Sequence, residues 1–582
     1  MLSFNDIKKN IKEDYSGFAR IRLALMGDSA TQLFRMALRG WAFREKIDLE
    51  IFEADYDQID RLIFDETSEL YSFDPGFIVL FQTTAKLKQQ FYALPKTRVR
   101  QFAQDHLDHV REACAALQSR LGSKIIYLNF NELDDREFGN YATKTATSFL
   151  YQLRKINFDL MTYSQDNPGF FVGDLSYLIS QTGMGEAIDD KFHISADMAF
   201  APDFFVTLAK NILDIIKAAV GRITKCVILD LDNTLWGGVI GDDGLEKIEI
   251  GDYKLGKAFR ELQQLAKQLK ERGILLAVCS KNSETVAKEP FERHPEMVLR
   301  LDDFVLFVAN WENKADNIRY IRDVLDIGFD TMVFLDDNPF ERELVKQQIP
   351  EITVPDLPDD PARYLSFLRG ENLFEMTTFS EEDSNRTALY QVDADRKKYK
   401  MSVADEKEFL KGLEMECEVG PFNPFTLPRV AQLIQRSNQF NLRTIRHSEE
   451  ALGKMLGSDR FFTLSFTLRD RFGDQGLISA VILEDKGGGR LFIDTWVMSC
   501  RVLKRRVEQF VLQQIAGVAA ENGFGIIAGE YIATSKNGLV RDLLRDLGFG
   551  QEAEGWSLRT EDVHPEDLFI KKLYTNYGHH RY

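Results

Sequence analysis

Two carboxylates, Asp230 and Asp232, follow a short apolar run at residues 227–229, and Thr234 lies just beyond them. The β-branched run is typical of a buried parallel strand, which would deliver both acids to its carboxyl end. Carboxylates in this position hold a divalent cation against an anionic substrate. The alternative is an ordinary Asp/Asn turn after a strand. This stretch alone leaves both interpretations open.

Two later apolar runs also end in polar groups. One ends at Ser280 and the other at Asp336 and Asp337, and Lys314 precedes the second of them. Ligands collect at the carboxyl ends of strands in an open parallel sheet, so we expect these groups to meet Asp230. The carboxylates would hold Mg²⁺, and the hydroxyl and ammonium groups would hold a phosphate. Neutralising the phosphate charge would let a carboxylate attack phosphorus and form an aspartyl-phosphate.

The residues at these strand ends carry a family resemblance. DLDNT at residues 230–234 matches the DxDxT signature of haloacid-dehalogenase-like (HAD) phosphotransferases, and Ser280, Lys314 and the pair Asp336 and Asp337 match the other three motifs. The longer stretches LDLDNTLWGGVIGDDG, SKNSE, FLDDNPFERE and WVMSCRVLKRRVE resemble FkbH-like proteins. We therefore expect a central Rossmann-like HAD domain, and the residue roles of that superfamily follow as implications of the resemblance.

By this resemblance Asp230 would be the nucleophile and Asp232 the general acid/base. The ligands of Mg²⁺ would be Asp230, the backbone carbonyl of Asp232, Asp336 and Asp337. The groups that position the phosphoryl group would be Thr234, Ser280 and Lys314. Residues 236–251 are expected to form a short flap, and no insertion long enough for a large cap separates Asp230 from Ser280. An open site of this kind accepts a large or protein-tethered substrate.

FkbH-like proteins are associated with loading a glyceryl unit from 1,3-bisphosphoglycerate onto the phosphopantetheine arm of an acyl carrier protein. The resemblance thus implies a phosphorylated small-molecule substrate and a carrier protein in trans. Such loading needs a thiol, and Cys500 is the candidate because a strand is predicted before it and a helix over residues 501–522 after it. A helix N-terminus and neighbouring cations both favour the thiolate. A buried structural cysteine is the alternative.

The chain of 582 residues is long enough for several domains. Alternating strand and helix patterns predict an α/β domain with a parallel sheet over residues 1–220, followed by the HAD-like domain at 221–375. The longer strands of residues 376–582, after a connector helix at 383–399, predict an α+β domain. The strand and helix around Cys500 resemble GNAT acyltransferases, although Lys504 and Arg506 stand where a phosphate-binding loop has glycines.

The N-terminal domain contains a GDS block, with Ser29 after a predicted strand, that resembles SGNH hydrolases. The DxxH partner of that family is missing, and Gln82 and Thr83 replace its oxyanion-supporting asparagine. We therefore expect a noncatalytic SGNH-like (flavodoxin-like) domain in which Ser29 caps the following helix.

Composition narrows the class of protein. The formal net charge of −18 argues against nucleic-acid partners. The five cysteines lack CxxC spacing, which fits a reducing compartment, and neither a signal peptide nor a membrane-length apolar run is evident. We expect a cytoplasmic protein that does not enter a membrane.

Three hypotheses for function remain at this point. The first is a Mg²⁺-dependent HAD phosphatase that dephosphorylates a three-carbon acid and passes its glyceryl group through a cysteine thioester to a carrier protein. The second is a HAD phosphatase for another metabolite, such as a sugar phosphate in polysaccharide synthesis, with noncatalytic flanking domains. The third is a noncatalytic scaffold, which the intact acidic motifs disfavour.

Overall fold

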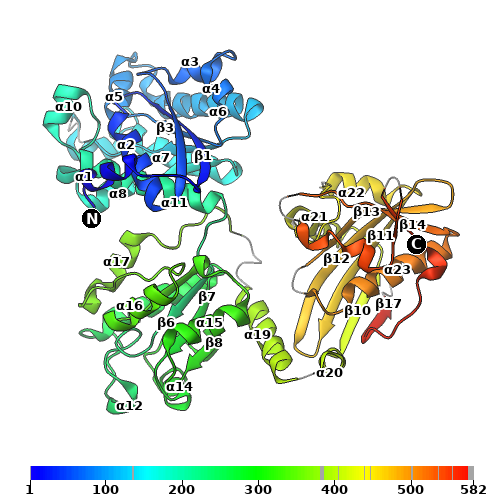
Figure 1. The fold of residues 1–582 in the computed structure, drawn as a ribbon. Coiled ribbons are helices and arrows are strands. Elements are labelled where there is room, and N and C mark those ends of the chain that lie inside the picture. The colour runs from blue at the N-terminus through cyan, green and yellow to red at the C-terminus, as the bar shows by residue number, and fades with distance from the viewer. Residues whose placement is uncertain are drawn as a thin grey trace. The chain divides into compact units, whose positions relative to one another are not determined.

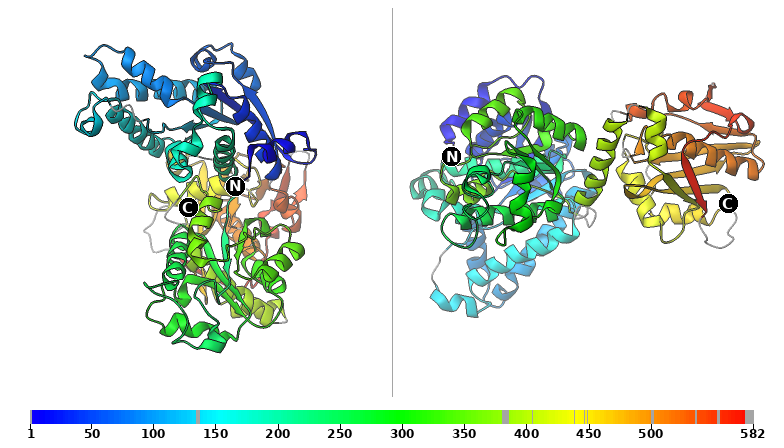
Figure 2. Two further views of the ribbon diagram at one scale, coloured as in Figure 1. Left: turned by 90° about the vertical axis from the view of Figure 1, so that its left-hand side faces the viewer. Right: turned by 90° about the horizontal axis from the view of Figure 1, so that it is seen from below.

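The computed structural model describes residues 2–133, 137–379, 386–403, 405–437, 439–445, 447, 449–499, 502–534, 537–552 and 555–574. The chain forms two compact units. One consists of Met1–Thr224 with Ser366–Ser380, and the other of Lys225–Leu365 with Glu381–Tyr582. Figure 1 labels the elements, and Figure 2 shows them from two further directions.

The first unit is built on a five-stranded sheet with the order β2-β1-β3-β4-β5. All of its strand pairs are parallel, which confirms the predicted sheet type. The strands are β1 (Ala19–Gly27), β2 (Ile47–Glu53), β3 (Phe77–Phe81), β4 (Lys124–Leu128) and β5 (Phe170–Gly173). Separate apolar cores lie on its two faces, one with α2 (Gln32–Arg44) and α11 (Pro202–Ala219), the other with α6 (Phe102–Arg120) and α7 (Phe149–Asp166).

The sheet that carries the acidic motifs has four parallel strands in the order β8-β7-β6-β9. They are β6 (Cys226–Leu229), β7 (Leu275–Ser280), β8 (Phe304–Ala309) and β9 (Met332–Leu335). Its helices include α13 (Gly256–Glu271), α14 (Glu284–Arg293), α15 (Lys314–Leu325) and α16 (Pro339–Gln348). Strand β6 lies between β7 and β9, so the residues that follow these three strands meet at one edge.

The rest of the second unit contains an eight-stranded sheet with the order β15-β16-β14-β13-β12-β11-β10-β17. Most pairs are antiparallel, whereas β13 with β14 and β10 with β17 are parallel. Its longest strands are β11 (Phe461–Asp470), β12 (Gly473–Asp485) and β13 (Arg490–Met498), and its shorter ones are β10 (Met415–Gly420), β14 (Ile526–Gly529), β15 (Gly550–Gln551), β16 (Trp556–Arg559) and β17 (Ile570–Tyr574). The connector helix is α19 (Arg386–Ser402).

The helix predicted from residue 501 begins later in the structure. Helix α23 spans Val507–Glu521, and Arg506 precedes it. Lys504 and Arg506 both have left-handed backbone angles, with φ of 60° and 61°, which a continuous right-handed helix does not allow. Cys500 lies outside the described residues. The prediction that this helix starts at residue 501 is wrong, because α23 begins at Val507.

Within the described part of the chain, no helix is both long enough and apolar enough to span a bilayer.

Candidate active site

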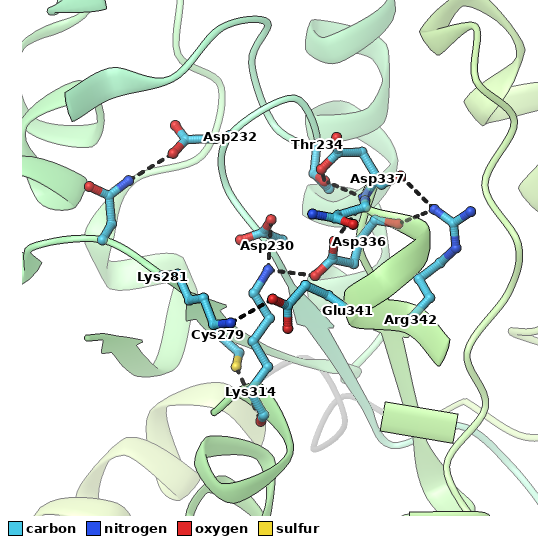
Figure 3. A network of polar contacts seen from close by, with 12 residues as sticks. Asp230, Asp232, Thr234, Cys279, Lys281, Lys314, Asp336, Asp337, Glu341 and Arg342 are labelled. Carbon is cyan, nitrogen blue, oxygen red and sulfur yellow. Dashed lines mark hydrogen bonds and ion pairs between the residues drawn. The ribbon is translucent and has the colours of Figure 1, made fainter. Parts of the chain in front are cut away.

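Asp230 lies directly after β6, whose four residues are all buried. The Asp230 residue itself is only 6% exposed. Lys314, the first residue of α15, places its ammonium nitrogen 2.9 Å from Asp230 Oδ2 and 2.5 Å from Asp336 Oδ2 (Figure 3). Lys314 is itself 3% exposed. One buried cation thus joins the acidic groups that follow β6 and β9.

Asp230, Asp336 and Asp337 form a cluster of carboxylates with oxygen atoms within 4.8 Å of one another. Asp230 Oδ1 is buried and accepts no hydrogen bond from any described group. Burying an oxygen without a partner is costly, and a bound cation would supply the missing partner. Carboxylate oxygens are the donors that Mg²⁺ prefers. These three residues therefore fit a magnesium ion.

The electrostatics of the cluster favour a cation as well. Burial and the charge of Asp230 raise the pKa of Asp336 and of Asp337, although Lys314 opposes both effects. Burial alone would lower the pKa of Lys314, but the charges of Asp230 and Asp336 outweigh it and raise that pKa. Three carboxylates thus share one ammonium group, which leaves negative charge for a divalent ion to balance.

Thr234 and Ser280, the hydroxyls expected to position a phosphoryl group, lie at the same edge. Thr234 Oγ1 accepts a hydrogen bond from the Asp337 backbone N–H (3.1 Å) and donates one to Asp337 Oδ1 (3.4 Å). Ser280 ends β7 and is 2% exposed. The structure therefore brings together all three residues expected to bind phosphate, Lys314 included.

Asp232 has a different environment, because its side chain is committed to the segment that follows it. Oδ1 accepts from Trp236 Nε1 and from the Ile240 N–H, both at 2.9 Å, and Oδ2 accepts from Asn282 Nδ2 at 2.9 Å. Burial raises the pKa of Asp232, while the hydrogen bonds from Ile240 and Trp236 oppose the rise. Residues 236–251 contain the short helix α12 (Ile240–Asp243), so Asp232 holds the start of the expected flap.

Arg342 is a contributor that the sequence did not single out. Its Nη1 donates to the backbone carbonyls of Asp336 (2.9 Å) and Asp337 (2.6 Å), and it is buried. It thereby fixes the loop that carries two of the three clustered carboxylates. A signal was present, since Arg342 lies within the FLDDNPFERE stretch, but an arginine in the first turns of a helix is usually solvated.

In the first unit, the prediction that Ser29 caps a helix is wrong. Helix α2 begins at Gln32, and Thr31 precedes it. Ser29 Oγ is buried and has no hydrogen-bond partner among the described groups. The Thr83 N–H donates to both carboxylate oxygens of the neighbouring Asp28 (3.0 Å each), and burial raises the pKa of Asp28 to about 6. Among the described residues, none therefore accepts a hydrogen bond from the Ser29 hydroxyl.

Four of the five cysteines lie within the described residues, and all four are buried. Burial raises the pKa of each thiol, to about 12 for Cys114 and Cys417 and further for Cys226 and Cys279. The sequence placed Cys417 in a polar stretch, whereas it lies in β10. The raised pKa disfavours the thiolate, which is the nucleophilic form, in each of these four. The role of Cys500 as acyl acceptor stays a prediction, because Cys500 is not described.

Comparisons with known proteins give the class of this chain. Residues 22–217 match the model of the FkbH N-terminal domain. A crystal structure of the N-terminal part of BF1531 from Bacteroides fragilis, which contains a phosphatase domain and is complexed with Mg, is 46% identical with a TM-score of 0.63. The match covers 65% of this chain and 100% of that chain. The chain thus belongs to the FkbH-like family and contains a HAD-like phosphatase domain.

Two acetyltransferases also match, at much lower similarity. The ribosomal-protein-S18-alanine N-acetyltransferase of Escherichia coli is 12% identical with a TM-score of 0.20, over 25% of this chain and 94% of that chain. The GNAT domain of PAT from S. lividans is 18% identical with a TM-score of 0.20, over 24% and 89%. These similarities are too low to assign a function to any part of the chain. No curated protein matches.

Proposed function

We propose that this protein is a Mg²⁺-dependent phosphatase for a phosphorylated three-carbon acid of the 1,3-bisphosphoglycerate type, and that it passes the glyceryl group through a Cys500 thioester to a carrier protein. The observation that carries the phosphatase part of the proposal is the buried contact of Lys314 with Asp230 and Asp336, with Asp337 beside them. The three-carbon acid, the Cys500 thioester and the carrier protein rest on the resemblance to FkbH-like proteins. The magnesium in the 46% identical phosphatase structure supports the choice of ion.

The chain supplies a nucleophile and a proton carrier. Lys314 Nζ lies 2.9 Å from Asp230 Oδ2 and fixes the position of this carboxylate, so that one of its oxygens can attack phosphorus. The new bond joins Asp230 to phosphorus, the bond from phosphorus to the substrate oxygen breaks, and that oxygen takes a proton from Asp232. Water then attacks the aspartyl-phosphate, gives a proton back to Asp232, and releases phosphate. Mg²⁺ held by Asp230, Asp336 and Asp337 would neutralise the charge of the phosphoryl group.

The two halves of the proposal require different bonds to break. A thioester forms when a thiolate attacks the acyl carbon of the acyl phosphate, the C–O bond breaks, and inorganic phosphate leaves with the electrons of that bond. Attack by Asp230 on the phosphorus of that acyl phosphate would instead release a free carboxylate and lose the activation. We therefore assign Asp230 to the phosphate ester at the other end of the substrate and Cys500 to the acyl phosphate. A thiol of the carrier protein then takes the acyl group by thioester exchange.

The experiment is phosphate release from 1,3-bisphosphoglycerate, with and without Mg²⁺, read together with intact-protein mass. The proposal expects a glyceryl increment on wild-type enzyme that is absent from Cys500→Ala. If the enzyme releases phosphate but carries no glyceryl group within a single turnover, the thioester step is wrong. The phosphatase activity would then stand without it. A clear preference for a sugar phosphate would select a phosphatase for another metabolite instead.

Asp232→Asn separates the catalytic role of this residue from its structural one. Asparagine keeps one oxygen that accepts from Trp236 and Ile240, and its NH₂ can donate to Asn282 once the Asn282 amide turns its oxygen toward it. We therefore expect the thermal unfolding temperature to change little. Loss of the transferable proton should lower the turnover number by about 10²- to 10⁴-fold. Phosphate release and calorimetry on the same preparation test this. Unchanged turnover would exclude Asp232 as the general acid.

Magnesium affinity is expected to depend on pH. Because burial and mutual repulsion raise the pKa of Asp336 and Asp337, protons compete with the ion at higher pH than for ordinary aspartates. Affinity should therefore fall as pH falls, approaching about tenfold per pH unit where one proton must leave. Isothermal titration of Mg²⁺ between about pH 8 and pH 6 measures this. An affinity that stays constant over that range would contradict the assignment of these ligands.

A further inference from the structure

A second ion pair crosses the active-site edge beside the one made by Lys314. Lys281 directly follows Ser280 at the end of β7, and its ammonium nitrogen lies 2.6 Å from Glu341 Oε1 (Figure 3). Glu341 belongs to α16, which follows β9. Because β6 lies between β7 and β9, a contact between these two segments spans the carboxyl end of β6, where Asp230 stands.

Both members of this pair lie beside the catalytic cluster. Figure 3 shows Lys281 and Glu341 next to Asp230 and Lys314. Lys281 and Glu341 therefore border the site in which the phosphoryl group would bind.

The two members of the pair are unequal in exposure and in hydrogen bonding. The Lys281 side chain is 36% exposed, whereas that of Glu341 is 8% exposed. Glu341 Oε2 is buried and has no hydrogen-bond partner among the described groups. An ammonium group has three N–H donors, so Lys281 can bind Glu341 and still donate to a ligand. The pair thus offers a ligand two groups, the partly exposed ammonium group of Lys281 and the buried, unpaired Oε2 of Glu341.

We propose that Lys281, held by Glu341, is a specificity-determining residue that binds the anionic acyl end of the substrate while the phosphate ester lies at Asp230. The free oxygen of Glu341 accepts a hydrogen bond from a hydroxyl on the carbon between them. The substrate class is therefore a phosphate ester of a hydroxy acid, with a carboxylate or acyl phosphate at its other end. This inference rests on the proposed function and adds a determinant of its selectivity.

The inference also orders the two reactions. A thioester is neutral, so once the acyl group is bound to the thiol it can no longer form an ion pair with the Lys281 ammonium group. Recognition of an anionic acyl end therefore places removal of the ester phosphate before acyl transfer to the thiol.

The test compares three phosphate esters in the presence of Mg²⁺. 3-Phosphoglycerate has a hydroxyl and a carboxylate, glycerol 3-phosphate has hydroxyls but no carboxylate, and p-nitrophenyl phosphate has neither. In Lys281→Met we expect kcat/KM for 3-phosphoglycerate to fall by about tenfold to a hundredfold, as for loss of a hydrogen bond to a charged group. The values for the other two esters should stay within about threefold of wild type. Lys281→Arg should recover part of the loss on 3-phosphoglycerate.

A matched control is Lys288→Met. Lys288 lies on α14, is 34% exposed and pairs with Glu284, so the variant removes the same charge at similar exposure. Lys288→Met should leave kcat/KM unchanged for all three esters. If Lys281→Met lowers kcat/KM equally for all three esters, the pair of Lys281 and Glu341 has only a structural role, and the inference is overturned. A wild-type enzyme that hydrolyses none of the three esters, nor 1,3-bisphosphoglycerate, would instead overturn the proposed function.

Discussion

Replacing Asp230 by asparagine is expected to abolish phosphate release from a phosphate ester such as 3-phosphoglycerate, with a loss in kcat of at least about four orders of magnitude. An amide is a poor nucleophile toward phosphorus, and Asp230→Asn also withdraws an anionic ligand from the cluster with Asp336 and Asp337. The fold should survive, because asparagine has nearly the same shape and one carboxylate fewer next to Asp336 relieves the repulsion that raises the pKa of that residue. The measurement is steady-state phosphate release at saturating Mg²⁺.

Asp323→Asn is the control for this change. Asp323 lies on α15 in the same part of the chain, but its side chain is 56% exposed and pairs with the exposed Arg322. That variant should keep wild-type kcat. Normal turnover in Asp230→Asn would remove Asp230 as nucleophile, whatever the control does.

Replacing Lys314 by methionine has the largest expected effect on stability. Lys314 and both of its partners are buried, so the change leaves Asp230 and Asp336 facing each other without a cation. Breaking a buried ion pair in this way costs about 3–5 kcal/mol. Because the chain has more than one unit, the readout is hydrogen exchange of peptides from β6 and β9, in which the free energy of opening should fall by that amount. Added Mg²⁺ should recover part of the loss, since it binds the folded site.

Lys267→Met gives the matched comparison. The buried carboxylate of Asp303 pairs with Lys267 and with Lys270, each at 2.6 Å. Removing one of these two partially exposed lysines leaves the other in place, so the loss should stay below about 1 kcal/mol. Equal losses in the two variants, or no recovery of Lys314→Met by Mg²⁺, would contradict the role assigned to Lys314.

The acidic site was readable from the sequence because its groups stand directly at strand ends. A strand of four buried apolar residues has little freedom, so the residue after it is fixed at the edge of the sheet. Strand β9 (Met332–Leu335), for example, lies where the apolar run before Asp336 predicts a strand. Strand order then brings Asp230, Ser280 and Asp336 to one edge.

The sequence was less informative where a side chain acts through a distant loop or where the backbone is irregular. Nothing in the helical pattern around Arg342 indicates that it binds two carbonyls of the preceding turn. The positive φ angles of Lys504 and Arg506 delay α23, although neither residue type favours that conformation. Ser29 likewise lies too far before Gln32, the first residue of α2, to cap that helix. Helix propensities do not locate the start of a helix to within one or two residues.

The most direct test of the central claim is to trap the phosphorylated enzyme. Wild-type protein mixed with substrate and Mg²⁺, quenched in acid within one turnover and digested, should yield the peptide containing residues 226–229 and Asp230 with one added phosphoryl group on Asp230. The increment should disappear without Mg²⁺ and in Asp230→Asn. Rapid phosphate release with no phosphoryl group on Asp230 at any quench time, or a phosphoryl group on another residue, would contradict the account.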